Sequence, residues 1–125
     1  MSTIQSTDEL YGLLDRAGPH RSFAGGEVIF LQGEVGEAVY VVRAGSVALK
    51  DGERLVETVP TPGLFGELAL IENEPRALTA VADGDAELVE IPTRRFWVLV
   101  HETPYFAQLV MHEMAQRLRN RDPAT

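Results

Sequence analysis

The residues best suited to chemistry are Gly66, Glu67 and Arg76, which lie within one short stretch of the chain. Gly66 precedes a run of helix-forming residues, and the N-terminus of a helix presents unpaired backbone amides with a positive partial charge. Arg76 follows Glu67 by nine residues at the start of a predicted strand, from which its guanidinium is able to swing back toward those amides. Amides on one side and a guanidinium on the other form a small cradle for an anion.

Glu67 carries the wrong charge for contact with an anion. Its carboxylate fits the site if it accepts a hydrogen bond from a neutral donor, such as a sugar hydroxyl, or if it pairs with Arg76. An anion beside a hydroxyl describes a nucleotide. Each residue alone also has a structural interpretation, since a strand arginine often forms a surface ion pair and an early helical glutamate complements the helix dipole.

The elements that position these residues begin with a helix predicted over residues 6–18. Ser6 and Glu9 match a capping box, in which each side chain satisfies a free backbone amide of the other. Gly18-Pro19 supplies the stop signal. One apolar face is expected to dock on the rest of the fold, and it consists of Leu10, Leu13 and Leu14.

Residues 21–92 predict a β-roll, because glycines recur between short runs of β-branched and aromatic residues. Asp51-Gly52 is a hairpin signal, and a short helix over Gly66–Glu72, ended by Pro75, interrupts the strands. The predicted strands are Val28–Leu31, Val39–Val42, Val47–Leu49, Leu55–Val59, Leu78–Val81 and Leu88–Ile91.

Residues 93–121 predict two C-terminal helices, the first capped by Thr93 and the second beginning at Thr103-Pro104. Arginines near the end of the second helix, Arg117 among them, complement its dipole. An apolar stripe at helical spacing comprises Phe106, Leu109, Val110, Met114 and Leu118. The predicted fold class is α+β, mainly β: an antiparallel β-roll or jelly roll with an N-terminal helix, a short inserted helix and two C-terminal helices.

The stretch Phe65-Gly66-Glu67-Leu68-Ala69-Leu70-Ile71, followed by Pro75-Arg76-Ala77, resembles the phosphate-binding cassette of cyclic nucleotide-binding domains. That family includes regulatory subunits of cyclic-AMP-dependent kinase and the sensor domain of the catabolite activator protein. The resemblance covers nearly the whole chain, because the family shows an N-terminal helix, an eight-stranded jelly roll that holds the cassette, and two C-terminal helices. It assigns residues 65–82 to the cassette and residues 1–125 to a single domain.

The resemblance also implies roles. Arg76 would pair with the exocyclic oxygens of the cyclic phosphate, and Glu67 would accept a hydrogen bond from the ribose 2′-hydroxyl. The amides of Ala69 and Ala77 would complete the cradle, with Gly66 allowing close approach. Ala77 lacks the hydroxyl that helps family members hold guanine, so cyclic AMP is favoured over cyclic GMP. The predicted ligand-binding residues are Gly66, Glu67, Leu68, Ala69, Pro75, Arg76 and Ala77.

Two cassette positions depart from the family pattern, since Leu78 stands where a small residue is common and Ala80 where valine is usual. Leu78 alternates with Ala77 along the strand and is predicted to point into the core, so it does not interfere with the site. The last helix is expected to supply a lid over the base. Its candidates are Met111, Met114 and Arg117.

Composition excludes several classes of partner and activity. A formal net charge of −8 repels nucleic acid and anionic membranes, so neither is an expected partner. The chain has no cysteine, and its three histidines lack metal-ligand spacing, so we predict no catalytic residue, no metal, no cofactor and no enzymatic activity. The N-terminus shows no signal-peptide pattern, which predicts a cytoplasmic protein.

The leading hypothesis is a sensor that binds cyclic AMP and converts occupancy into movement of the C-terminal helices. The alternative is a jelly roll retained as a protein-interaction module without nucleotide binding. A homodimer or effector contact through the last helix is a further expectation. With no DNA-reading helices after residue 121, the chain is either a free-standing sensor or one domain of a longer protein.

Overall fold

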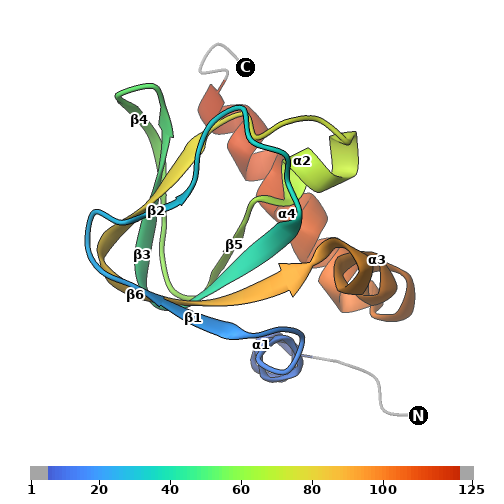
Figure 1. Cartoon of the computed structure of the whole chain (residues 1–125). Helices are drawn as coiled ribbons and strands as arrows, with labels where there is room; N and C mark the ends of the chain where they lie inside the picture. The colour runs from blue at the N-terminus through green and yellow to red at the C-terminus, as the bar shows by residue number, and fades with distance from the viewer. Residues whose placement is uncertain (1–5, 122–125) are drawn as a thin grey trace.

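The computed structural model describes residues 6–121 and shows one curled antiparallel sheet with helices beside it (Figure 1). Helices α2, α3 and α4 gather on one side of the roll, and α1 lies near the end of β1 (Figure 1). The strands are β1 (His20–Phe23), β2 (Val28–Phe30), β3 (Ala38–Asp51), β4 (Arg54–Val59), β5 (Gly63–Phe65) and β6 (Thr79–Pro92). The helices are α1 (Thr7–Leu14), α2 (Glu67–Glu72), α3 (Thr93–Glu102) and α4 (Pro104–Arg121).

Strands β3 and β6 pair along most of their length and form the spine of the roll. Each contains two of the predicted shorter strands, because pairing continues through the bends near Gly45 and Gly84. The register slips between Val42 and Ala44 and again between Ala44 and Ser46, and such bulges bend a strand without ending it. The described residues therefore form six strands, whereas the family resemblance implied eight. The predicted fold class, a mainly β antiparallel roll with helices, is confirmed.

Two further strands carry no clear sequence signal. The three polar residues of β1 are exposed and only Phe23 is buried, and β1 pairs with β6. The three residues of β5 pair with β3 and lead directly into α2. By contrast, the Asp51-Gly52 hairpin between β3 and β4 forms as predicted, with Gly52 at a φ of +61°.

Alternation along the sheet creates two cores. Tyr40 and Val42 of β3 face the interior of the roll, while Val39 and Val41 face the layer between the sheet and the helices. The interior core also contains Phe23, Phe30, Leu49, Phe65, Leu78 and Leu88, and the outer core contains Leu10, Leu14, Phe96, Phe106 and Val110. The interior core surrounds the candidate site, and the outer core attaches α4 to it.

Helix boundaries differ slightly from the predictions. Helix α1 begins after Ser6, whose hydroxyl accepts a hydrogen bond from the Glu9 amide at 3.2 Å as predicted, but it ends at Leu14 rather than near residue 18. Helix α3 is preceded by Pro92 as its cap, so the assignment of Thr93 as N-cap is wrong. Proline donates no hydrogen bond, and its fixed φ is compatible with the residue before a helix. Among the helices of residues 6–121, none combines the length and apolarity needed to cross a membrane.

Candidate functional site

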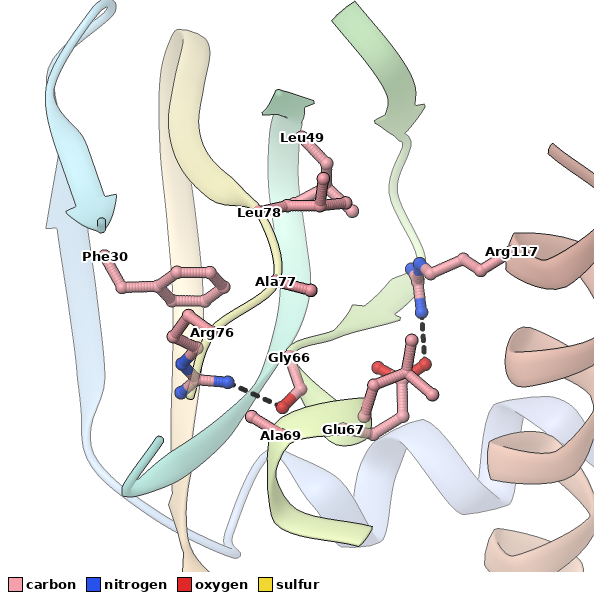
Figure 2. A pocket seen from close by; sticks show the side chains of 10 residues that line it. Phe30, Leu49, Gly66, Glu67, Ala69, Arg76, Ala77, Leu78 and Arg117 are labelled. Carbon is pink, nitrogen blue, oxygen red and sulfur yellow. Dashed lines mark hydrogen bonds and ion pairs between the residues drawn. The ribbon is translucent and has the colours of Figure 1, made fainter. Parts of the chain in front are cut away.

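The candidate site is a cavity of about 40 Å³ inside the roll, at the start of α2 (Figure 2). The cassette, the neighbouring strands and α4 all contribute to its wall. The lining residues are Phe30, Leu49, Gly66, Glu67, Leu68, Ala69, Arg76, Ala77, Leu78 and Arg117.

Gly66 makes the turn from β5 into α2. It has a φ of +88°, in the left-handed region that side chains other than glycine's disfavour. A Cβ atom placed there would lie 2.9 Å from Nη1 of Arg76. Glycine at this position therefore lets the backbone turn and lets the guanidinium approach. The helix that follows ends at Glu72 with Asn73 at a φ of +53°, so Asn73 ends it before Pro75 does.

Arg76 lies at the centre of this arrangement and is only 5% exposed. Its Nη1 donates to the Gly66 carbonyl and its Nη2 to the Ala38 carbonyl, both at 2.6 Å. The guanidinium also stacks over the Phe30 ring, 4.0 Å from its centroid. Burial lowers the pKa of Arg76, although a guanidinium remains charged at neutral pH. Its Nε has no hydrogen-bond partner, so a buried cation retains one donor for another group.

Glu67 is fully buried on the cavity wall. Its Oε1 accepts a hydrogen bond from Nη1 of Arg117, while its Oε2 has no partner. The predicted alternative partner, Arg76, therefore does not pair with it. Burial raises the pKa of Glu67, and the charge of Arg117 opposes that shift. Glu67 thus presents an unsatisfied acceptor to the cavity.

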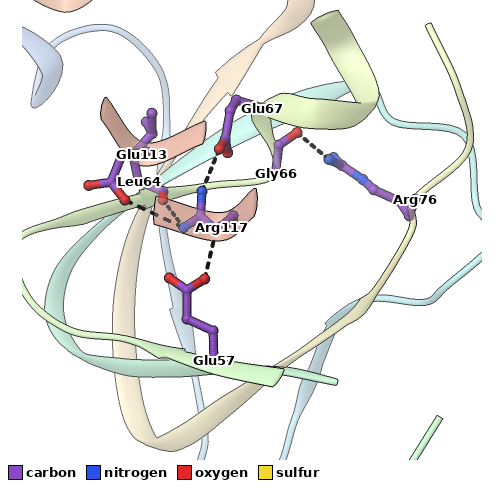
Figure 3. A network of polar contacts seen from close by, with 7 residues as sticks. All are labelled: Glu57, Leu64, Gly66, Glu67, Arg76, Glu113 and Arg117. Atoms are coloured by element: carbon purple, nitrogen blue, oxygen red, sulfur yellow. Dashed lines mark hydrogen bonds and ion pairs between the residues drawn. The ribbon is translucent and has the colours of Figure 1, made fainter. Parts of the chain in front are cut away.

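Arg117 brings α4 into the site and is 3% exposed (Figure 3). Its Nη2 donates to the Leu64 carbonyl, its Nε lies 3.2 Å from the carboxylate of Glu57, and its Nη2 lies 3.7 Å from that of Glu113. The sequence suggested Arg117 as a lid candidate and as a complement to the helix dipole. It did not indicate Glu57 or Glu113, because no local spacing links a β4 residue to the last helix.

The cavity unites six of the seven predicted ligand-binding residues. The seventh, Pro75, is exposed and does not line the cavity. Of the other lid candidates, Met111 is 61% exposed and Met114 packs against the outer core. Leu78 is buried in the interior core as predicted, and it also lines the cavity beside Leu49 (Figure 2). The cavity is therefore part of the interior of the roll.

A second hollow, of about 510 Å³, lies on another side of Arg76. Its wall includes the carboxylates of Glu34, Glu37 and Glu90, and the Tyr40 hydroxyl donates to Glu90 at 3.0 Å. Three carboxylates repel an anion, so an anionic ligand is favoured on the Gly66 side despite the smaller cavity there. Within residues 6–121, no group of three or more histidine, aspartate or glutamate side chains is placed to hold a metal ion.

The comparison with known families decides what this arrangement is. The family model described as the cyclic nucleotide-binding domain matches residues 20–103, which is most of the chain and includes the whole cassette. The chain belongs to the cyclic nucleotide-binding domain family. Its resemblance to kinase regulatory subunits and to the catabolite activator protein is therefore a family relationship.

The chain is also similar to individual proteins, in sequence and in structure. The Cyclic AMP receptor protein of Thermus thermophilus is 34% identical over 107 residues, covering 82% of this chain and 50% of that protein. The crystal structure of the Thermus thermophilus catabolite activator protein superimposes with a TM-score of 0.79 at 28% identity, over 95% of this chain and 58% of that one.

Another similar structure was solved in work on a cyclic-GMP-dependent signalling pathway that regulates bacterial phytopathogenesis. It superimposes with a TM-score of 0.78 at 28% identity, over 95% of this chain and 98% of that chain. The present chain spans half or less of the length of the curated relatives it matches.

Proposed function

We propose that this domain is a regulatory sensor that binds a cyclic nucleotide in the cavity beside α2. The observation that carries the proposal is a pair of buried polar atoms that lack a hydrogen bond, Nε of Arg76 and Oε2 of Glu67, on residues that line one cavity. Nε of Arg117, on the same wall, also lacks a hydrogen bond but pairs with Glu57 at 3.2 Å. An unpaired buried polar atom costs about 1–3 kcal/mol. A ligand that joins an anion to a hydroxyl would satisfy both atoms, and a cyclic nucleotide has its phosphate and its ribose 2′-hydroxyl close together.

Cyclic AMP is the proposed ligand. The proteins named as cyclic AMP receptor and cAMP-dependent kinase regulatory subunits are similar to this chain, and Ala77 supplies no hydroxyl for guanine. A cGMP-dependent protein kinase of Eimeria tenella is 31% identical over 96 residues, which makes cyclic GMP the competing ligand. The site residues that would hold either nucleotide are Gly66, Glu67, Ala69, Arg76 and Ala77.

Binding is proposed to change the position of α4. The cavity of about 40 Å³ is partly open to solvent, so a bound nucleotide would extend beyond it and press on the residues of its wall. Arg117 is the α4 residue on the cavity wall, and it is already bonded to Glu67. A ribose hydroxyl arriving at Glu67 would alter that contact, and a ligand shifts a conformation only through such differential contacts.

The test is a calorimetric titration of the wild-type chain with cyclic AMP, cyclic GMP and 5′-AMP. We expect cyclic AMP to bind most tightly and 5′-AMP to bind poorly, because its terminal phosphate carries extra charge. If no cyclic nucleotide binds or raises the melting temperature, the proposal is wrong and the protein-interaction module becomes the better hypothesis. Metal-dependent turnover of a test substrate would contradict the further proposal that the domain is a binding module and not an enzyme.

We also propose that α4 contacts a second copy of the chain. Met111 and Leu118 lie seven residues apart on α4 and are 61% and 60% exposed, and seven residues is the repeat that packs two helices together. Light scattering that finds only monomers, for both free and nucleotide-bound protein, would leave α4 as an effector-binding helix instead. Localisation in the cytoplasm stays a prediction from the sequence.

A further inference from the structure

A cluster of three carboxylates shares one guanidinium at the Glu67 end of the cavity (Figure 3). Arg117 is the shared cation, Glu67 lies on the cavity wall, Glu113 is on the same helix, and Glu57 comes from β4. The Glu57 and Glu113 side chains are 15% and 20% exposed, so the cluster is largely withdrawn from water.

We propose that Glu57 is a positioning residue of the nucleotide site, which acts through Arg117 to orient and to tune the ionisation of Glu67. This role rests on the proposed function. Glu57 does not line the cavity, and its carboxylate approaches Arg117 at Nε, on a different nitrogen from the one that donates to Glu67. This contact is an ion pair without a hydrogen bond, since Nε of Arg117 has no hydrogen-bond partner, so Glu57 acts on the guanidinium through its charge at close range.

The orientation matters because it decides which oxygen of Glu67 remains for the ligand. Arg117 occupies Oε1 and leaves Oε2 without a partner. With Glu57 removed, the guanidinium keeps its bond to the Leu64 carbonyl and its contact with Glu113, but it loses the anchor on the β4 side. Arg117 then keeps the contacts of its two Nη atoms and loses the charge that draws Nε toward β4, so its position against Glu67 is less firmly held.

The charge matters as well, since three carboxylates and one guanidinium leave an excess of two negative charges when all are ionised. Burial raises the pKa of Glu67, and the negative charge of Glu57 raises it further. The pKa of Glu113 is also raised by burial and by the negative charges of Glu67 and Glu57, while the charge of Arg117 opposes the shift. The charged or titratable groups that act on this cluster are Glu57 from β4, Arg76 from the cavity, Arg117, Glu113 and His112 from α4, and Tyr11 from α1.

A direct consequence is a pH dependence of ligand affinity. The unprotonated Oε2 of Glu67 accepts the ribose hydroxyl, so affinity for cyclic AMP falls as the pH drops through the pKa of Glu67. Removing the Glu57 charge lowers the pKa of Glu67, so the fall begins at a lower pH. A purely structural role for Glu57 would weaken binding equally at every pH.

The experiment measures cyclic AMP affinity by calorimetry between pH 5 and pH 8 for the wild type, Glu57→Gln and Glu53→Gln. Glu53 is exposed in the β3–β4 turn, so Glu53→Gln removes the same charge at a distance from the cluster. We expect Glu57→Gln to bind roughly fivefold more weakly at pH 8, because the lost contact is a partly exposed ion pair that acts on the ligand only through Arg117 and Glu67. We expect that deficit to shrink toward pH 5, and Glu53→Gln to follow the wild type throughout.

Each outcome decides the proposal. Profiles of Glu57→Gln and wild type that differ by a constant factor, or that coincide, overturn the role of Glu57 and leave the proposed function intact. Absence of cyclic AMP binding by the wild type at every pH overturns the proposed function and this role together. If Glu57→Gln does not fold, Glu113→Gln removes a carboxylate from the same guanidinium and has to show the same displaced profile, and an unchanged profile then overturns the proposal.

Discussion

Replacing Arg76 by lysine separates the charge of this side chain from its shape. Lysine keeps the positive charge but has one nitrogen in place of the fork that reaches the carbonyls of Gly66 and Ala38. A single ammonium group cannot bond both carbonyls and a phosphate with the same geometry. We therefore expect Arg76→Lys to fold but to bind cyclic nucleotide poorly.

The magnitude follows from the contacts. One charge-assisted hydrogen bond to the phosphate is worth about 1.5–3 kcal/mol, so its loss weakens binding roughly 10-fold to 100-fold. Stability also falls, because one buried carbonyl loses its donor and such an atom costs about 1–3 kcal/mol. The decrease in the free energy of unfolding is therefore similar in size to the loss in binding free energy.

The assay is calorimetry for affinity together with urea unfolding of the ligand-free protein. Arg43→Lys is the matched control, because the Arg43 guanidinium also lies over an aromatic ring, 5.3 Å from the ring centroid of Tyr11, and it pairs with Asp15 at 2.6 Å. It does not line the cavity. The control is expected to retain wild-type affinity.

One result would refute the reasoning about the fork. If folded Arg76→Lys binds cyclic AMP within about threefold of the wild type, a point charge is sufficient and the guanidinium geometry does not hold the phosphate. Equal losses of affinity in Arg76→Lys and Arg43→Lys would show instead that the effect is general to the fold.

Three further predictions follow from the same contacts. Gly66→Ala places a Cβ 2.9 Å from Nη1 of Arg76 at a φ of +88°, so urea unfolding is expected to show a loss of at least ~1 kcal/mol, and an unchanged midpoint would contradict it. Ala77→Thr adds one hydroxyl at an exposed cassette position, and competitive titration is expected to show roughly two- to tenfold higher relative affinity for cyclic GMP. Glu113 has a raised pKa in the fold, so it binds more protons when folded than when unfolded, and stability falls as the pH rises above its usual range. Unfolding measured from pH 4.5 to pH 8 is expected to show a smaller fall for Glu113→Gln, and an identical slope would exclude this contribution.

The cassette was predictable because its chemistry is local. Gly66, Glu67 and Arg76 lie within eleven positions of one another. A glycine before a helix, followed by an arginine on the next strand, forms the same local arrangement in any fold that contains that helix and strand. The cavity indeed brings these residues together. Family membership of the chain, expected from the same stretch, is confirmed by the family match.

The rest of the site depends on contacts between distant parts of the chain. Arg117 lies fifty residues from Glu67, and only the packing of α4 on the outer core brings it to the cavity. Neither Glu57 nor Glu113 differs in sequence context from a solvated carboxylate. The merged strands β3 and β6 were missed for a related reason, since a bulge at a glycine resembles a turn until the pairing partner is known.

The bonds from Arg76 to the Gly66 and Ala38 carbonyls have an evolutionary consequence. Selection for folding alone would keep this arginine in a descendant that no longer binds a nucleotide. Glu67 contributes less to the fold, because it accepts one side-chain bond, from Arg117, and its Oε2 is left without a donor. Mutational drift after loss of signalling is therefore expected to erase the glutamate first, which makes it the better marker of a working sensor among related genes.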